Sequence, residues 1–126
     1  MTCFDFSTYN HICQYLNIDV DSTGTIEVSC TANSSVSIAI GPSGNTGGFS
    51  PRKLKQTSGS DLMNYNLYTT SARTTIWGDG TQGTSTVNQL VRKQSPSNLT
   101  VYGTVPASQD VYVGLYTDSL VVTINY

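Results

Sequence analysis

The stretch that decides the fold is Leu120-Val121-Val122-Thr123-Ile124-Asn125-Tyr126, the last of the printed sequence. Every second residue in it is large and apolar, which is the period of two that marks a half-buried β-strand. We expect Leu120, Val122, Ile124 and Tyr126 to share the buried face. The stretch holds no Lys or Pro of the kind that blunts an exposed strand edge. Since no sequence follows it, we expect one edge of this strand to stay open and to pair with another strand.

Similar strand patterns recur along the rest of the chain, separated by segments rich in Gly, Pro, Ser and Asn. The clearest covers residues 24–30, where Ile26, Val28 and Cys30 alternate with polar side chains. Further strands are expected at 36–40, 62–68 and 99–105, with short ones at 51–55 and 75–77. The polar connector 31–35 has the length of a hairpin loop, so we expect the strands on either side of it to pair antiparallel.

Composition agrees with an all-β chain of one domain, residues 1–126. The chain has 126 residues, of which 37% are hydrophobic and 11% charged, and its net charge is -2. Six or seven short strands separated by turns are typical of an immunoglobulin-like antiparallel sandwich. The charge gives no reason to bind nucleic acid, and no apolar run is long enough to cross a bilayer, so neither partner is expected.

The cysteines indicate a compartment rather than a metal site. Cys3, Cys13 and Cys30 are an odd set without a Cys-x-x-Cys pair, and His11 is the only histidine. A tetrahedral zinc site would lack soft ligands, so no metal is expected. Cysteines in a low-charge, Thr-rich β chain instead favour an exported protein with one disulfide and one spare thiol. From the residues alone, all three pairings are open.

Few side chains are candidates for chemistry. The candidates are a His11 and Cys13 pair, the carboxylates Asp19 and Asp21, the turn carboxylate Asp79, and Trp77 as a sugar-stacking ring. We interpret Asp79, which lies between two glycines, as a turn cap, and Trp77 as a core residue. The sequence has no nucleophile elbow, phosphate loop or dinucleotide fingerprint. The chain is therefore expected not to be an enzyme and to need no cofactor.

Basic residues form two small clusters, one of Arg52, Lys53 and Lys55 and one of Arg92 and Lys93. Such clusters could meet an acidic partner. Because exposed charges are a common way of protecting the edge of a sheet, we expect these side chains to lie at the surface and to act as edge protection.

Four stretches occur together in a characteristic order: Asn64-Tyr65-Asn66-Leu67-Tyr68, Ser71-Ala72-Arg73-Thr74-Thr75-Ile76-Trp77-Gly78-Asp79-Gly80-Thr81, Thr100-Val101-Tyr102-Gly103-Thr104-Val105-Pro106-Ala107 and Val121-Val122-Thr123-Ile124-Asn125-Tyr126. In this order they resemble the spore coat protein U domain family, which includes pilin subunits of archaic chaperone-usher pili. Residues 6–10 and 24–30 resemble the first strands of that family, so the resemblance spans nearly the whole chain.

The resemblance implies an incomplete immunoglobulin-like sandwich that lacks its last strand. In such pili a periplasmic chaperone fills the gap until a donor strand of a neighbouring subunit replaces it at an outer-membrane usher. It implies an extracellular pilus on the cell surface, reached through the periplasm, that supports adhesion and biofilm formation. The groove would lie between one strand with Phe4 and Phe6 and another with Leu120, Val122, Ile124 and Tyr126.

The start of the chain departs from the family pattern. Polymerising members carry a donor segment before the first cysteine, but Cys3 is the third residue here, so we expect this chain to accept a strand and to have none to give. It would then be the pilin domain of a tip subunit or a trimmed chain. The resemblance implies a disulfide between Cys3 and Cys30, or alternatively between Cys13 and Cys30.

The alternative function is that of a spore or cell coat protein that packs laterally through exposed β edges.

Overall fold

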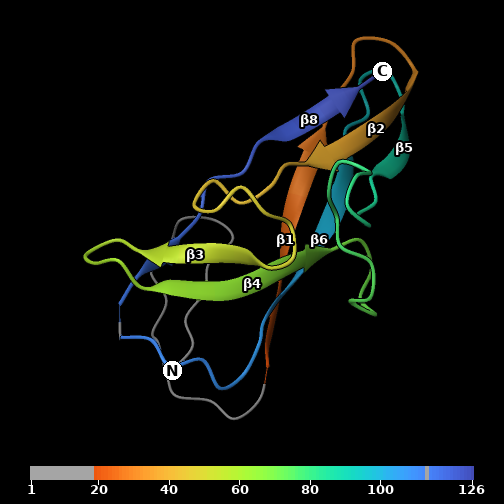
Figure 1. Ribbon diagram of the computed structural model, residues 1–126. Helices are drawn as coiled ribbons and strands as arrows, with labels where there is room; N and C mark the ends of the chain where they lie inside the picture. The colour runs from red at the N-terminus through yellow and green to blue at the C-terminus, as the bar shows by residue number, and fades with distance from the viewer. Residues whose placement is uncertain (1–18, 113) are drawn as a thin grey trace.

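The computed structural model describes residues 19–112 and 114–126, and every element in them is a β-strand. Five strands form one antiparallel sheet in the order β1-β6-β4-β3-β7, and three form a second in the order β5-β2-β8 (Figure 1). The strands are β1 (Val20–Val28), β2 (Ser34–Ile40), β3 (Arg52–Gln56), β4 (Leu62–Tyr68), β5 (Val87–Val91), β6 (Ser97–Val105), β7 (Tyr116–Thr117) and β8 (Val122–Asn125). The predicted all-β, immunoglobulin-like architecture is confirmed.

The core lies between the two sheets and is built from the alternating strands. In β6, Leu99, Val101, Gly103 and Val105 are buried, while the residues that alternate with them are exposed or half-buried. β1 pairs with β6 along its whole length, from Val20 opposite Val105 to Val28 opposite Ser97. The period of two in the sequence therefore identified the face that each of these strands turns to the core.

The predicted hairpin between the first two strands is wrong. β1 pairs only with β6 among the described residues, whereas β2 lies in the other sheet between β5 and β8. The connector therefore crosses from one sheet to the other. Both arrangements suit its length, but the crossing places the apolar faces of both strands in one core, which a flat hairpin would not do.

The Trp-Gly-Asp-Gly motif is structural, as interpreted from the sequence. Trp77 is 1% exposed, and its indole Nε1–H donates to the Ile38 carbonyl at 2.9 Å. The Asp79 carboxylate accepts a hydrogen bond from the Thr81 amide at 2.9 Å. Hydrogen bonding to Thr81 lowers the pKa of Asp79, because the bonds favour the charged carboxylate. Trp77 thus fills the core, and Asp79 closes the turn that follows it.

Arg52 is buried rather than at the surface, so the prediction of an exposed edge charge is wrong for this residue. Its side chain is 0% exposed. The guanidinium donates to the carbonyls of Ile40 at 3.0 Å, Gly41 at 2.8 Å and Trp77 at 2.7 Å, and to Asn66 Oδ1 at 3.1 Å. Desolvation lowers the pKa of Arg52, since burial disfavours the charged form.

The burial of Arg52 follows from its place in β3. Alternate positions of this strand face the core, and Arg52 and Leu54 occupy two of them, while Lys55 is exposed as expected. The guanidinium offers five donors in a planar fork. Through these donors, Arg52 links the carbonyls at the end of β2 to the carbonyl of Trp77. These hydrogen bonds hold together the loops at one end of the sandwich.

Candidate functional site

Two edge strands face each other across the open side of the sandwich. β8 pairs only with β2, from Ser37 opposite Asn125 to Ile40 opposite Val122, within the part of the chain that the structure describes. Among the described strands, β1 is likewise paired on one side only, by β6. Figure 1 shows β8 alongside β2 in one sheet and β1 alongside β6 in the other. Within residues 19–112 and 114–126, the sandwich thus lacks a strand between β8 and β1.

In the segment that leads into β8, the backbone carbonyls of alternate residues are hydrogen-bonded to other described residues. The carbonyl of Ser119 accepts from the Gly44 amide at 3.1 Å, and that of Val121 accepts from the Gly41 amide at 2.8 Å. Backbone groups of successive strand residues point to opposite sides. The amide and carbonyl of Leu120 therefore point away from β2, and no other described residue pairs with them.

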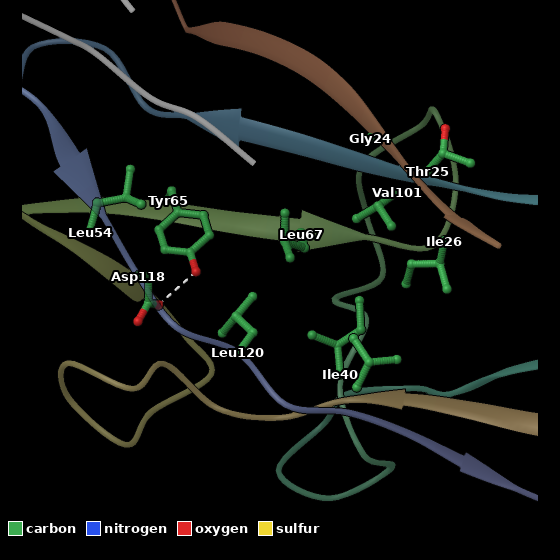
Figure 2. A pocket seen from close by; sticks show the side chains of 11 residues that line it. Gly24, Thr25, Ile26, Ile40, Leu54, Tyr65, Leu67, Val101, Asp118 and Leu120 are labelled. Atoms are coloured by element: carbon green, nitrogen blue, oxygen red, sulfur yellow. Dashed lines mark hydrogen bonds between the residues drawn. The ribbon is translucent and has the colours of Figure 1, made fainter. Parts of the chain in front are cut away.

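An apolar cleft of about 290 Å³ lies between the two edge strands. β1 contributes Ile26, while Leu120 and Val122 line the opposite side. Leu67 and Val101, from the larger sheet, are among the residues between them (Figure 2). The cleft is thus bordered by backbone groups that can pair with a further strand and lined by side chains that can pack against one.

One end of the cleft is polar. The Tyr65 hydroxyl donates to Asp118 Oδ2 at 2.7 Å, and Asp118 Oδ1 accepts from the amides of Ser119 at 2.8 Å and Asn45 at 3.3 Å. Burial and the hydrogen bond to Asp118 both raise the pKa of Tyr65, so this hydroxyl stays protonated and remains a donor. Figure 2 shows Asp118 beside Tyr65 and Leu54, away from Ile26 and Ile40 at the other end.

Two of the predicted groove residues line the cleft, and two do not. Leu120 and Val122 are among its lining side chains. Ile124 is 38% exposed and Tyr126 is 97% exposed, and neither is in the lining. Phe4 and Phe6 lie outside the described residues. The role of all six in holding a donor strand stays a prediction.

Sequence reasoning missed Asp118, although the signal was present. Asp118, Leu120 and Val122 follow each other at intervals of two residues and all line the cleft. The inward face of this segment therefore begins at Asp118, two residues before the first apolar residue of the pattern, Leu120. A charged residue at an inward position looks like a surface residue in a hydropathy pattern, which is why it was not included.

Of the three cysteines, the structure describes only Cys30. Cys30 is half-buried and packs against the core just after β1. Cys3 and Cys13, its two predicted partners, lie outside the described residues, as does His11, so the pairing stays a prediction. Residues 19–112 and 114–126 contain no cluster of three or more potential metal ligands. In this part of the chain no helix is long and apolar enough to span a membrane.

The chain is similar in sequence to a known domain family and similar in fold to a solved structure. A sequence model of the Spore Coat Protein U domain matches residues 4–123. "Protein U" of Myxococcus xanthus is 32% identical over 129 residues, which cover 97% of this chain and 70% of that protein. A solved structure shares the fold with a TM-score of 0.62 and 16% identity, and the match covers 85% of this chain and 35% of that one. It is the CsuC-CsuE chaperone-tip adhesion subunit pre-assembly complex from archaic chaperone-usher Csu pili of Acinetobacter baumannii.

Proposed function

The chain belongs to the Spore Coat Protein U domain family, and from this premise we propose that it is a structural subunit of an extracellular fibre that accepts a donor strand between β1 and β8. The observation that carries the proposal is the apolar cleft, which is flanked by two edge strands that have no partner on that side among the described residues. Adding a strand to such an edge satisfies backbone groups and fills side-chain pockets in one step.

The size of the hydrophobic contribution explains why such a subunit would need its partner. Alternate side chains of an inserted strand would point into the cleft. About four apolar side chains at roughly 1.5 to 3 kcal/mol each would contribute about 6 to 12 kcal/mol. This is comparable with the net stability of a whole domain, about 5 to 15 kcal/mol. The strand would therefore decide whether the domain is stable.

The proposed setting is a pilus assembled by a chaperone and an usher. A solved structure with the same fold is a complex between a chaperone and a pilus tip subunit, which supports the extension to this chain. A periplasmic chaperone would occupy the edge of β8 first, and a neighbouring subunit's strand would replace it at an outer-membrane usher. The fibre would lie on the cell surface and serve adhesion and biofilm formation.

A second candidate function is favoured by the family's own description, which refers to a spore coat. In that case the edges of β8 and β1 would pair with neighbouring copies of the chain, and the subunits would pack laterally into a coat without a chaperone. The two candidates differ in what the chain does alone. A coat protein would form ordered assemblies without an added strand. A pilus subunit would not assemble until a donor strand is supplied.

Thermal unfolding with and without a strand tests the proposed function. The probe is a synthetic peptide of about nine residues with Val at alternate positions and Ser or Lys between them. At a concentration of about 100 times its Kd, the peptide is expected to stabilise the chain by about 2.7 kcal/mol and to raise Tm by roughly 10 °C. A peptide of the same composition without the alternation is the control. A sharp, peptide-independent transition of the monomer would contradict the proposal.

A further inference from the structure

We infer that the cleft selects its strand by chemistry at one position, where the side chain that reaches Asp118 must carry a hydrogen-bond donor while the neighbouring inward side chains are apolar. The occupant is a strand from another subunit with apolar residues at alternate positions and one Ser, Thr or similar donor in that series. This inference rests on the proposed function and specifies the partner that the same site accepts.

The spacing of the lining residues puts the carboxylate in line with the apolar positions. Asp118, Leu120 and Val122 are two residues apart, and all three line the cleft. A strand that pairs with this edge places its own alternate side chains beside them in turn. One of these side chains therefore meets the carboxylate, and the next ones meet Leu120 and Val122.

The carboxylate has room for a further donor. An ionised carboxylate has about four acceptor sites, two on each oxygen. Oδ1 accepts from the amides of Ser119 and Asn45, while Oδ2 accepts only from the Tyr65 hydroxyl among the described residues. In Figure 2 this bond between Tyr65 and Asp118 lies at one end of the cleft. One acceptor site on Oδ2 is therefore left for a ligand.

When an inserted strand covers the cleft, the side chain that it places over Asp118 strongly affects the affinity of binding. Asp118 is half-buried before a strand enters, and water can reach the part that is exposed. An apolar side chain placed over Asp118 would remove that water without providing a hydrogen bond in its place, which is unfavourable for a charged group. A hydroxyl would replace the water with a hydrogen bond to a charged acceptor. The difference between the two is expected to be about tenfold in Kd or more.

A set of isosteric peptides tests the inference. The host is the alternating Val peptide described above, and a single Thr replaces each inward Val in turn, because Thr has the shape of Val with a hydroxyl in place of one methyl. Calorimetric titration is expected to find one Thr position at which the peptide binds about tenfold more tightly than the all-Val host. Testing every position avoids any assumption about the register of the strand.

Two variants locate the effect at Asp118. Asp118→Asn removes the charge and is expected to reduce the preference for Thr to within about threefold. Tyr65→Phe removes a competing donor and is expected to increase the preference, so the two variants move it in opposite directions. If the wild-type chain binds the host and all Thr peptides equally, the inference is wrong and the proposed function stands. If it binds none of them, both are wrong.

Discussion

Replacing Leu120 with Asp is expected to weaken the binding of an inserted strand by at least about a hundredfold. Leu120 lines the cleft, and its backbone lies on the open edge. A strand that covers the cleft would bury the new carboxylate without a partner, which costs about 3 to 5 kcal/mol. The nearby charge of Asp118 adds repulsion. Titration with the alternating Val peptide measures the loss directly.

Val121→Asp is the matched control for this prediction. Val121 is the next residue, is 71% exposed, and its carbonyl is bonded to the Gly41 amide on the other side of the segment. The same charge at this position stays in water, so we expect little change in peptide affinity. Ile124→Asp, at a side chain outside the cleft lining, is expected to lie between the two. Equal affinities for Leu120→Asp and Val121→Asp would show that the strand does not cover the cleft.

Replacing Arg52 with Met is expected to destabilise the folded domain by about 3 to 5 kcal/mol. The loss of the guanidinium would leave the buried carbonyls of Ile40 and Trp77, and the half-buried carbonyl of Gly41, without this donor. Met fills most of the volume of the Arg stem, so the lost hydrogen bonds dominate the effect. Urea unfolding of the peptide-bound chain measures the free energy of unfolding.

Lys55→Met serves as the control, because it removes a positive charge from the same strand at an exposed position. Its effect on the free energy of unfolding is expected to stay within about 0.5 kcal/mol. A loss as small as this for Arg52→Met would mean that the buried guanidinium does not hold the loops together. Similar losses for both variants would point to the charge rather than to the hydrogen bonds.

Sequence patterns predicted the strands in which apolar and polar residues alternate. They did not predict strands in which this pattern is short, or which strand pairs with which when the two are far apart in the sequence. The strand expected at 62–68 is β4 itself, and β6 extends the expected stretch 99–105 by two residues. β5 and β7 were not predicted, since each is short and carries no alternation strong enough to stand out from the polar background. The pairing of the first two strands was wrong because hairpin length alone does not decide between pairing in one sheet and crossing to the other.

The site was predicted in part for a related reason. Leu120 and Val122 were identified because apolar side chains at alternate positions reveal an inward face. Asp118 and Arg52 also occupy inward positions, but their charge hides this in the sequence. Only the three-dimensional structure brings their hydrogen-bond partners together, Tyr65 for Asp118 and the backbone carbonyls for Arg52.

Amide hydrogen exchange followed by NMR, with and without the bound peptide, tests the central proposal most directly. The Leu120 amide points away from β2 and has no partner among the described residues, so it is expected to exchange rapidly in the free chain. Binding is expected to slow its exchange by about a hundredfold or more, while exposed amides on the outer edge of β5 stay unchanged. A peptide that binds and protects β5, or any edge other than those of β8 and β1, while the Leu120 amide still exchanges rapidly would contradict the proposal.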